Sequence, residues 1–131
     1  MDDAFVQHGT FSWCELMTTD VAAAKSFYTE LLGWSITETP VGDAPYHIIS
    51  IGGREIGGIM VIAPRAAGAF PAWGAYVTVD DVDAIAQKAQ ELGARTLVPL
   101  TDVPDVGRFY TFQDPQGAVL SVISYVKTSE A

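Results

Sequence analysis

The chain has few groups for covalent or redox chemistry, because only one of its 131 residues is a cysteine. Cys14 alone can form no intrachain disulfide and no pair of redox thiols. This cysteine usage is typical of a reducing compartment, so we expect a cytoplasmic protein. The sequence also has no nucleophile–base pattern and no phosphate-binding glycine loop, which leaves catalytic triads and nucleotide sites without support.

Basic residues are scarce as well. Seven Lys and Arg oppose sixteen Asp and Glu, for a formal net charge of −9. Nucleic acids and anionic membranes attract basic surfaces, so we expect neither as a partner. No apolar run approaches the roughly 20 residues that span a bilayer, and the acidic start is not typical of a signal peptide. Hydrophobic residues make up 49% of the chain, enough for a substantial core.

Hydrophobic spacing divides the chain into two copies of one strand–helix–three-strand order. The first copy begins with an aromatic and apolar strand at 11–18, followed by an Asp20 cap and a helix from Val21 to the residue before Gly33. The other expected elements are strands at 34–39, 45–51, 55–62 and 73–79, a helix over 82–92 ended by Gly93, and strands at 95–98, 107–113 and 118–125. We expect a single domain with unit one at about 8–63, a linker at 64–72 and unit two at about 73–126.

Three motifs lie in an order and spacing that resemble a known family. Phe27–Trp34 reads FYTELLGW, Asp114–Gly117 reads DPQG, and Val79–Asp83 precedes Leu92-Gly93. Together they resemble the vicinal oxygen chelate superfamily, which includes glyoxalases and bleomycin-resistance proteins. The resemblance implies an α+β fold, in which two tandem βαβββ units form a curled mixed sheet around a concave pocket. It also implies a small-molecule ligand and a homodimer.

Many members of that superfamily hold one metal ion, with ligands on the first and last strand of each unit. By the resemblance, the four positions are Trp13, Gly58, Gly74 and Ser121 in this chain. A divalent ion needs at least three nitrogen, oxygen or sulfur donors, so we expect no metal and no other cofactor. The possible donors of an unusual metal site are His8, His47, Glu15 and Asp114.

Side chains alternate between the two faces of a strand, so the orientation of Trp13 selects the residues that line the expected pocket. The ligand-binding candidates are Trp13, Met17, Gly58, Met60, Gly74, Thr78 and Ser121, and the catalytic candidates are Glu15 and Tyr76. Trp13 could stack on a planar ligand or simply fill the core. Tyr76 could donate a hydrogen bond to a ligand or only fill space.

Glu15 has two readings. A carboxylate facing an apolar cavity should have a raised pKa and could act as a general acid or base. Alternatively it is solvated or pairs with Arg54 or Arg108. Arg108 itself follows an expected loop at 101–107 and could grip an anionic ligand, although a surface arginine is the simpler interpretation. Cys14 is expected to pack beneath the first helix as a small hydrophobic residue.

Three functions remain open at this point. The chain could be a metal-independent protein that binds an antibiotic or secondary metabolite. It could be a metal-free enzyme that transfers a proton with Glu15 or Tyr76. It could also be a metal-dependent lyase or isomerase, if the assignment of the metal positions is wrong.

Overall fold

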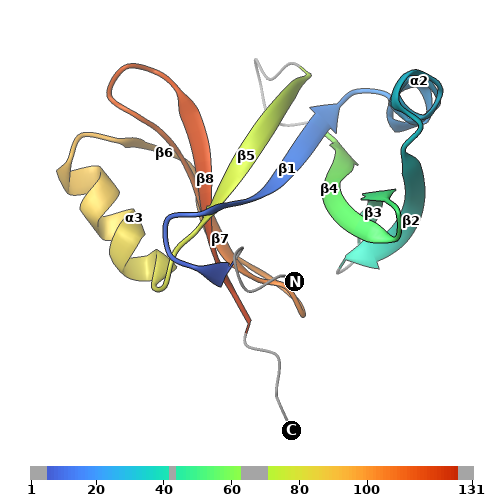
Figure 1. Cartoon of the computed structure of the whole chain (residues 1–131). Helices are drawn as coiled ribbons and strands as arrows, with labels where there is room; N and C mark the ends of the chain where they lie inside the picture. The colour runs from blue at the N-terminus through green and yellow to red at the C-terminus, as the bar shows by residue number, and fades with distance from the viewer. Residues whose placement is uncertain (1–5, 42–43, 63–70, 127–131) are drawn as a thin grey trace, which may run out of the picture. The chain divides into compact units, whose positions relative to one another are not determined.

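The computed structural model describes residues 6–41, 44–62 and 71–126. Within these ranges the chain forms eight strands and two helices (Figure 1). The first set of elements is β1 (Phe11–Thr18), α2 (Val21–Leu32), β2 (Ser35–Val41), β3 (Ala44–Ile51) and β4 (Arg54–Val61). The second set is β5 (Ala72–Thr78), α3 (Val82–Glu91), β6 (Arg95–Val103), β7 (Gly107–Gln113) and β8 (Val119–Tyr125). The expected pair of βαβββ units is therefore confirmed.

The chain divides into two compact units by its internal contacts. The first unit comprises residues 13–74, and the second unit combines the residues up to Ser12 with those from Ala75 onward. The start of the chain thus belongs with its second half. It is held there by backbone hydrogen bonds of 2.7 Å from Gly9 N to Thr78 O and 2.8 Å from Thr78 N to Thr10 O.

The strands of each unit follow the same order. In the first unit the order is β2-β3-β4-β1, and in the second it is β5-β8-β7-β6. The first strand of each set runs parallel to the last, whereas the other neighbours are antiparallel. This repeated order explains why the two halves of the sequence share a hydrophobic pattern despite little identity.

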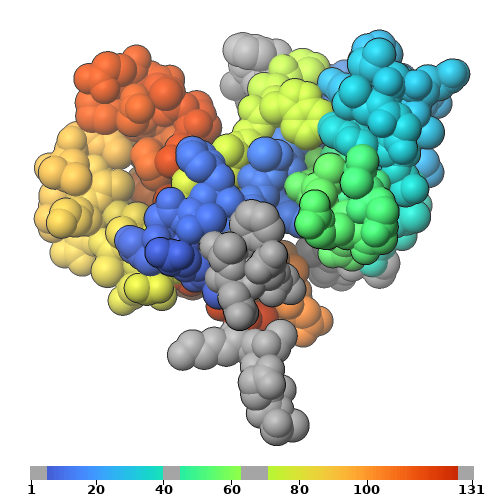
Figure 2. Space-filling view, viewed as in Figure 1, coloured from blue at the N-terminus to red at the C-terminus, as the bar shows by residue number. Residues whose placement is uncertain are grey.

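Each sheet buries one face against its own helix. The first core consists of Leu16, Ile36, Ile49 and Ile59, with Val21, Ala24, Tyr28 and Trp34 packed against it. The second core consists of Val79, Val82, Ala86, Tyr110 and Val122. Each helix covers the core face of its own sheet, and Figure 2 draws the atoms of both helices in space-filling form. No helix in the described ranges is long and apolar enough to cross a membrane.

Both helices begin where the sequence predicts, because their caps are local, and α2 also ends there. Helix α3 ends at Glu91, one residue before the predicted end. The Asp20 carboxylate accepts a hydrogen bond from Ala23 N at 3.0 Å, which satisfies a free amide of the first turn. Gly33 ends α2 in the left-handed conformation, with φ of 72°, and donates its amide to Thr29 O. The second helix repeats the start of this arrangement, with Asp81 accepting from Ala84 N at 3.1 Å.

Two expectations about local structure are wrong. Strand β6 continues to Val103, so Thr101 and Asp102 belong to a strand and not to the loop expected at 101–107. The pairing of β6 with β7 is irregular between Thr96 and Thr101, and Pro99 lies within that stretch, which hides the strand pattern in the sequence. Cys14 is exposed and not buried. Its partner across the sheet is Gly57, which has no side chain to cover it.

Candidate functional site

The candidate site of the first unit lies on the sheet face opposite α2. Since Leu16 points into the core, strand alternation turns Trp13, Glu15 and Met17 to the other face. The parallel pairing of β1 with β4 places Glu15 beside Gly58 and Met17 beside Met60. The structure therefore brings five of the predicted residues together on two neighbouring strands.

A chain of hydrogen bonds connects this face to a residue that sequence reasoning missed. Trp13 Nε1–H donates to the Tyr46 hydroxyl oxygen at 2.9 Å, and the Tyr46 hydroxyl donates to Glu15 Oε2 at 2.7 Å. All three side chains are partly buried. Tyr46 lies on β3, which is separated from β1 by β4. The second bond is short, as expected when an O–H donates to a carboxylate.

Gly58 allows Tyr46 to cross the sheet. A Cβ atom at position 58 would overlap the Tyr46 ring and hydroxyl, so the phenol lies directly over the bare Cα of Gly58. The neighbouring glycine has another role, because a Cβ at Gly57 would lie 2.6 Å from the Cys14 carbonyl oxygen. Gly57 therefore serves close backbone approach, whereas Gly58 leaves space for a side chain.

The remaining predicted residues are placed differently. Gly74, in the first unit, is an exposed residue in the first half of β5, and a Cβ there would come no closer than 4.0 Å to the Glu15 carbonyl oxygen. In the second unit, Tyr76 lies opposite Ser121 in the β5–β8 pairing. The Ser121 hydroxyl shares a 2.7 Å hydrogen bond with Thr111. Ser121 and Thr78 are both buried.

The Tyr76 ring is held by an aromatic neighbour in the same unit. Its centroid lies 6.0 Å from that of Phe109, with an interplanar angle of 66°, which is an edge-to-face contact. The second unit thus presents aromatic rings and small hydroxyl groups on this face of its sheet. It contributes no carboxylate among the predicted site residues.

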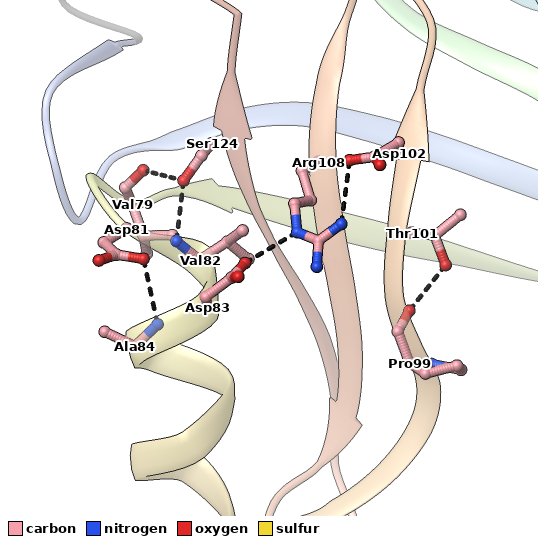
Figure 3. A network of polar contacts seen from close by, with 10 residues as sticks. All are labelled: Val79, Asp81, Val82, Asp83, Ala84, Pro99, Thr101, Asp102, Arg108 and Ser124. Carbon is pink, nitrogen blue, oxygen red and sulfur yellow. Dashed lines mark hydrogen bonds and ion pairs between the residues drawn. The ribbon is translucent and has the colours of Figure 1, made fainter.

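Arg108 forms ion pairs with two carboxylates of its own unit. Its Nε donates to Asp83 at 2.8 Å and one terminal nitrogen donates to Asp102 at 3.1 Å (Figure 3). These hydrogen bonds, first to Asp83 and then to Asp102, raise the pKa of the guanidinium. The contacts favour the simpler interpretation of a surface arginine, which joins the start of α3 to the β6–β7 edge.

Two of the possible metal donors accept hydrogen bonds from backbone amides, and a third has a ring nitrogen that is buried without a hydrogen-bond partner. Asp114 accepts from the backbone amides of Gln116 and Ala118 at 2.9 and 3.0 Å, so it stabilises its own turn as expected. His8 Nδ1 accepts from Asp80 N at 3.0 Å. The Nδ1 atom of His47 is buried without a hydrogen-bond partner.

The described side chains at these positions therefore form no donor set that fits a divalent ion. Among residues 6–41, 44–62 and 71–126, no three His, Cys, Asp or Glu side chains lie together as a metal site. Over Gly58, where the resemblance places one ligand, the space is filled by the Tyr46 phenol. A surface groove of about 510 Å³ lies elsewhere, on α2, and is lined by Ser26, Phe27, Glu30 and Leu31.

Comparison with known proteins places the chain in a family. Residues 10–122 match the model of the Glyoxalase/Bleomycin resistance protein/Dioxygenase superfamily. The CFP32 protein of Mycobacterium tuberculosis, named as a proposed glyoxylase, is 38% identical over 119 residues. The anthracycline biosynthesis protein DnrV of Streptomyces peucetius is 31% identical over 127 residues. These matches cover 88% and 87% of this chain but only 46% of each relative, so the chain spans about half their length.

Solved structures give the same fold. Methylmalonyl-CoA epimerase from Mycobacterium tuberculosis superposes with a TM-score of 0.63, covering 97% of this chain and 93% of the epimerase, at 15% identity. A variant of the Streptomyces coelicolor epimerase in complex with 2-nitronate-propionyl-CoA superposes with a TM-score of 0.66, at 16% identity over 92% of this chain and all of that chain. At such low identity the likeness concerns the fold alone. The match over residues 10–122 shows that the chain belongs to the glyoxalase/bleomycin resistance protein/dioxygenase superfamily.

Proposed function

We propose that this protein binds an aromatic small molecule, such as an antibiotic or secondary metabolite, without a resident metal ion. The ligand would lie against the face that carries Trp13, Glu15 and Tyr46. The observation that carries the proposal is the hydrogen-bonded chain of these three side chains, at 2.9 and 2.7 Å. It supplies an indole surface and an oriented carboxylate, a combination of apolar and polar groups that is usual in small-molecule sites.

Two further facts support the proposal, one on binding without a metal ion and one on the class of ligand. The four positions at which the resemblance expects metal ligands hold Trp13, Gly58, Gly74 and Ser121, which offer a single hydroxyl oxygen. The relative named for anthracycline biosynthesis also suggests a ligand class, namely planar aromatic polyketides. The indole of Trp13 could stack on such a ring system.

The first test is a fluorescence titration of the whole protein with a soluble anthracycline as probe, in the presence of EDTA. We expect saturable quenching of tryptophan emission with one probe per chain, unchanged when EDTA is replaced by Mg²⁺, Ni²⁺ or Zn²⁺. The variant Trp13→Leu should weaken binding at least tenfold, which corresponds to about 1.4 kcal/mol. Asp83→Asn, which alters a carboxylate in the second unit outside the site, is the matched control. Binding that appears only with a divalent ion would contradict the proposal.

A second candidate function is proton transfer without a metal. The observation that favours it is the Tyr46 hydroxyl held 2.7 Å from the Glu15 carboxylate, because a fixed carboxylate is a suitable general base. Glu15→Gln separates the two functions. In a protein that only binds, Glu15→Gln should leave the affinity for a neutral probe unchanged. In an enzyme, the same variant should still bind but lose turnover by 100-fold or more, roughly the usual contribution of a general base.

We also propose that the chain works as a homodimer in the cytoplasm. The dimer is an expectation from the family to which the chain belongs, and the cytoplasmic location is an expectation from its single cysteine. Light scattering at several protein concentrations measures the mass directly. A mass of about 14 kDa at all concentrations would contradict the dimer.

A further inference from the structure

We infer that Tyr46 is the positioning residue of the candidate site, and that Gly58 is the residue that allows it to act. This inference deepens the proposed function, because it concerns the same face of the first unit. It states that the orientation of Glu15 is not a property of β1 alone. A phenol from β3 holds the carboxylate from across the sheet.

The first step of the argument is steric. Tyr46 and Glu15 lie on strands separated by β4, so a side chain that joins them must pass over a residue of β4. That residue is Gly58, which is paired with Glu15 in the β1–β4 register and with Ile48 in the β3–β4 register. Any side chain at position 58 would occupy the path of the phenol, as the overlap of a Cβ with the Tyr46 ring shows. Gly58 therefore leaves the space above β4 that the Tyr46 phenol occupies.

The second step concerns the direction of the hydrogen bonds. The Trp13 indole can only donate a hydrogen bond, and Glu15 Oε2 accepts one. The Tyr46 hydroxyl between them therefore accepts a hydrogen bond from the indole N–H and donates one to the carboxylate. The indole N–H polarises the phenol in the sense that strengthens its donation to Glu15. The three groups thus form one polar unit, and a change at Glu15 should be transmitted to Trp13 through Tyr46.

The steric part is tested by a mutant cycle on the whole chain. Gly58→Ala should lower the melting temperature by roughly 5–10 °C, because overpacking costs about 1–3 kcal/mol. In the Tyr46→Ala background the same change should cost almost nothing, since the added methyl group enters the vacated space. Gly57→Ala is the matched control. Its Cβ meets the Cys14 backbone oxygen at 2.6 Å, so its cost should be equal in both backgrounds.

The polar part is tested without any ligand, in the conservative variant Tyr46→Phe. In the wild-type protein, the indole N–H signal of Trp13 in a ¹H–¹⁵N spectrum should shift as Glu15 is titrated with acid. Glu15→Gln and Tyr46→Phe should each abolish this shift. The indole of Trp73, which donates to the Tyr28 hydroxyl at 3.3 Å, should be unaffected in both variants and serves as the internal control.

The outcomes separate this inference from the proposed function. Equal costs of Gly58→Ala with and without Tyr46, or a Trp13 signal that still titrates in Tyr46→Phe, would overturn the inference. Intact coupling in a protein that binds no aromatic probe would overturn the proposed function and leave the inference standing. If both hold, Tyr46→Phe should weaken probe binding about tenfold at unchanged stoichiometry, and Gly58→Ala should do the same.

Discussion

The Ser121 and Thr111 hydroxyl groups illustrate how a polar pair is kept on a sheet face. Their oxygens are 2.7 Å apart, and Ser121 is only 8% exposed. A buried hydroxyl that loses its hydrogen-bond partner still carries the free-energy cost of its desolvation. Removing both hydroxyls together removes this cost. The pair is therefore expected to be coupled energetically.

Replacement of either member should show this coupling. We expect Ser121→Ala and Thr111→Val each to lower the free energy of unfolding by about 1–2 kcal/mol. The double variant should cost less than the sum of the two single changes. Urea unfolding followed by circular dichroism measures all four proteins. Strict additivity would show that the two hydroxyls do not depend on one another.

Tyr125 gives the protein a pH dependence at high pH. Burial raises the pKa of this phenol above 10.0, and the hydrogen bond shared with Ser12 at 2.8 Å offsets only part of that effect. The folded protein therefore keeps the proton in a pH range where the unfolded chain has lost it. Because the unfolded state then binds fewer protons, the free energy of unfolding falls as pH rises through this range.

We expect the wild-type protein to lose more stability than Tyr125→Phe between pH 9 and 11.5. Below pH 9 the difference between the two proteins should be constant, since the phenol is neutral in both folded and unfolded states. Urea unfolding at a series of pH values gives the comparison. Tyrosinate absorbance at 295 nm should also show one late-titrating phenol in the wild type that is missing in the variant. Parallel stability curves up to pH 11.5 would contradict the assignment.

At the scale of elements, the start of α3 is held by two independent devices. Asp81 caps the helix through Ala84 N, and Ser124 on β8 accepts from Val82 N at 3.0 Å while donating to Val79 O at 2.8 Å (Figure 3). The first device is local to the helix, and the second ties its first turn to the sheet. Helix α2 has the equivalent local cap in Asp20.

Removing the local cap should therefore be tolerated but measurable. Asp81→Ala is expected to lower the free energy of unfolding by about 1 kcal/mol, the usual value for an N-cap. Asp81→Asn should cost much less, because the amide oxygen can still accept from Ala84 N. Thermal unfolding of the three proteins tests this. An equal loss in the Asn and Ala variants would mean that the charge at position 81, and not the cap, stabilises the helix.

At the scale of the whole molecule, the start of the chain completes the second unit. His8, Gly9, Thr10 and Ser12 all form hydrogen bonds with residues beyond position 75, at 2.7–3.0 Å. The second unit is therefore not a contiguous piece of sequence. A break in the chain between Ile62 and Pro71 would separate it from the segment that satisfies the backbone of Thr78.

Deletion of residues 1–10 should loosen the second unit selectively. We expect the amide of Thr78, which donates to Thr10 O at 2.8 Å, to exchange with deuterium at least tenfold faster. The amides of the first core, such as those of Ile49 and Ile59, should keep their protection. Deletion of residues 1–7 alone is the control, because it retains His8 to Ser12. Equal loss of protection in both cores would show that the two units unfold as one.

Much of the fold could be predicted because its signals are local. The bounds of β1, α2 and β7 agree with expectation to the residue, since each depends on short-range periodicity and on caps or turns within a few positions. The predicted range of β6 is too short, because an irregular register and Pro99 break the alternation on which strand prediction depends. The family motifs could likewise be read directly from the residues 27–34 and 114–117.

The sequence by itself determined the order of the elements, their faces and the absence of ligand-type residues at the four positions where the family resemblance places a metal ion. Only the tertiary structure decided which side chains meet. Tyr46 lies 31 positions from Glu15, and no local pattern indicates that it crosses Gly58 to reach the carboxylate. Periodicity encodes which face a residue occupies, whereas strand register, set by the packing of the whole sheet, decides its neighbours across that face.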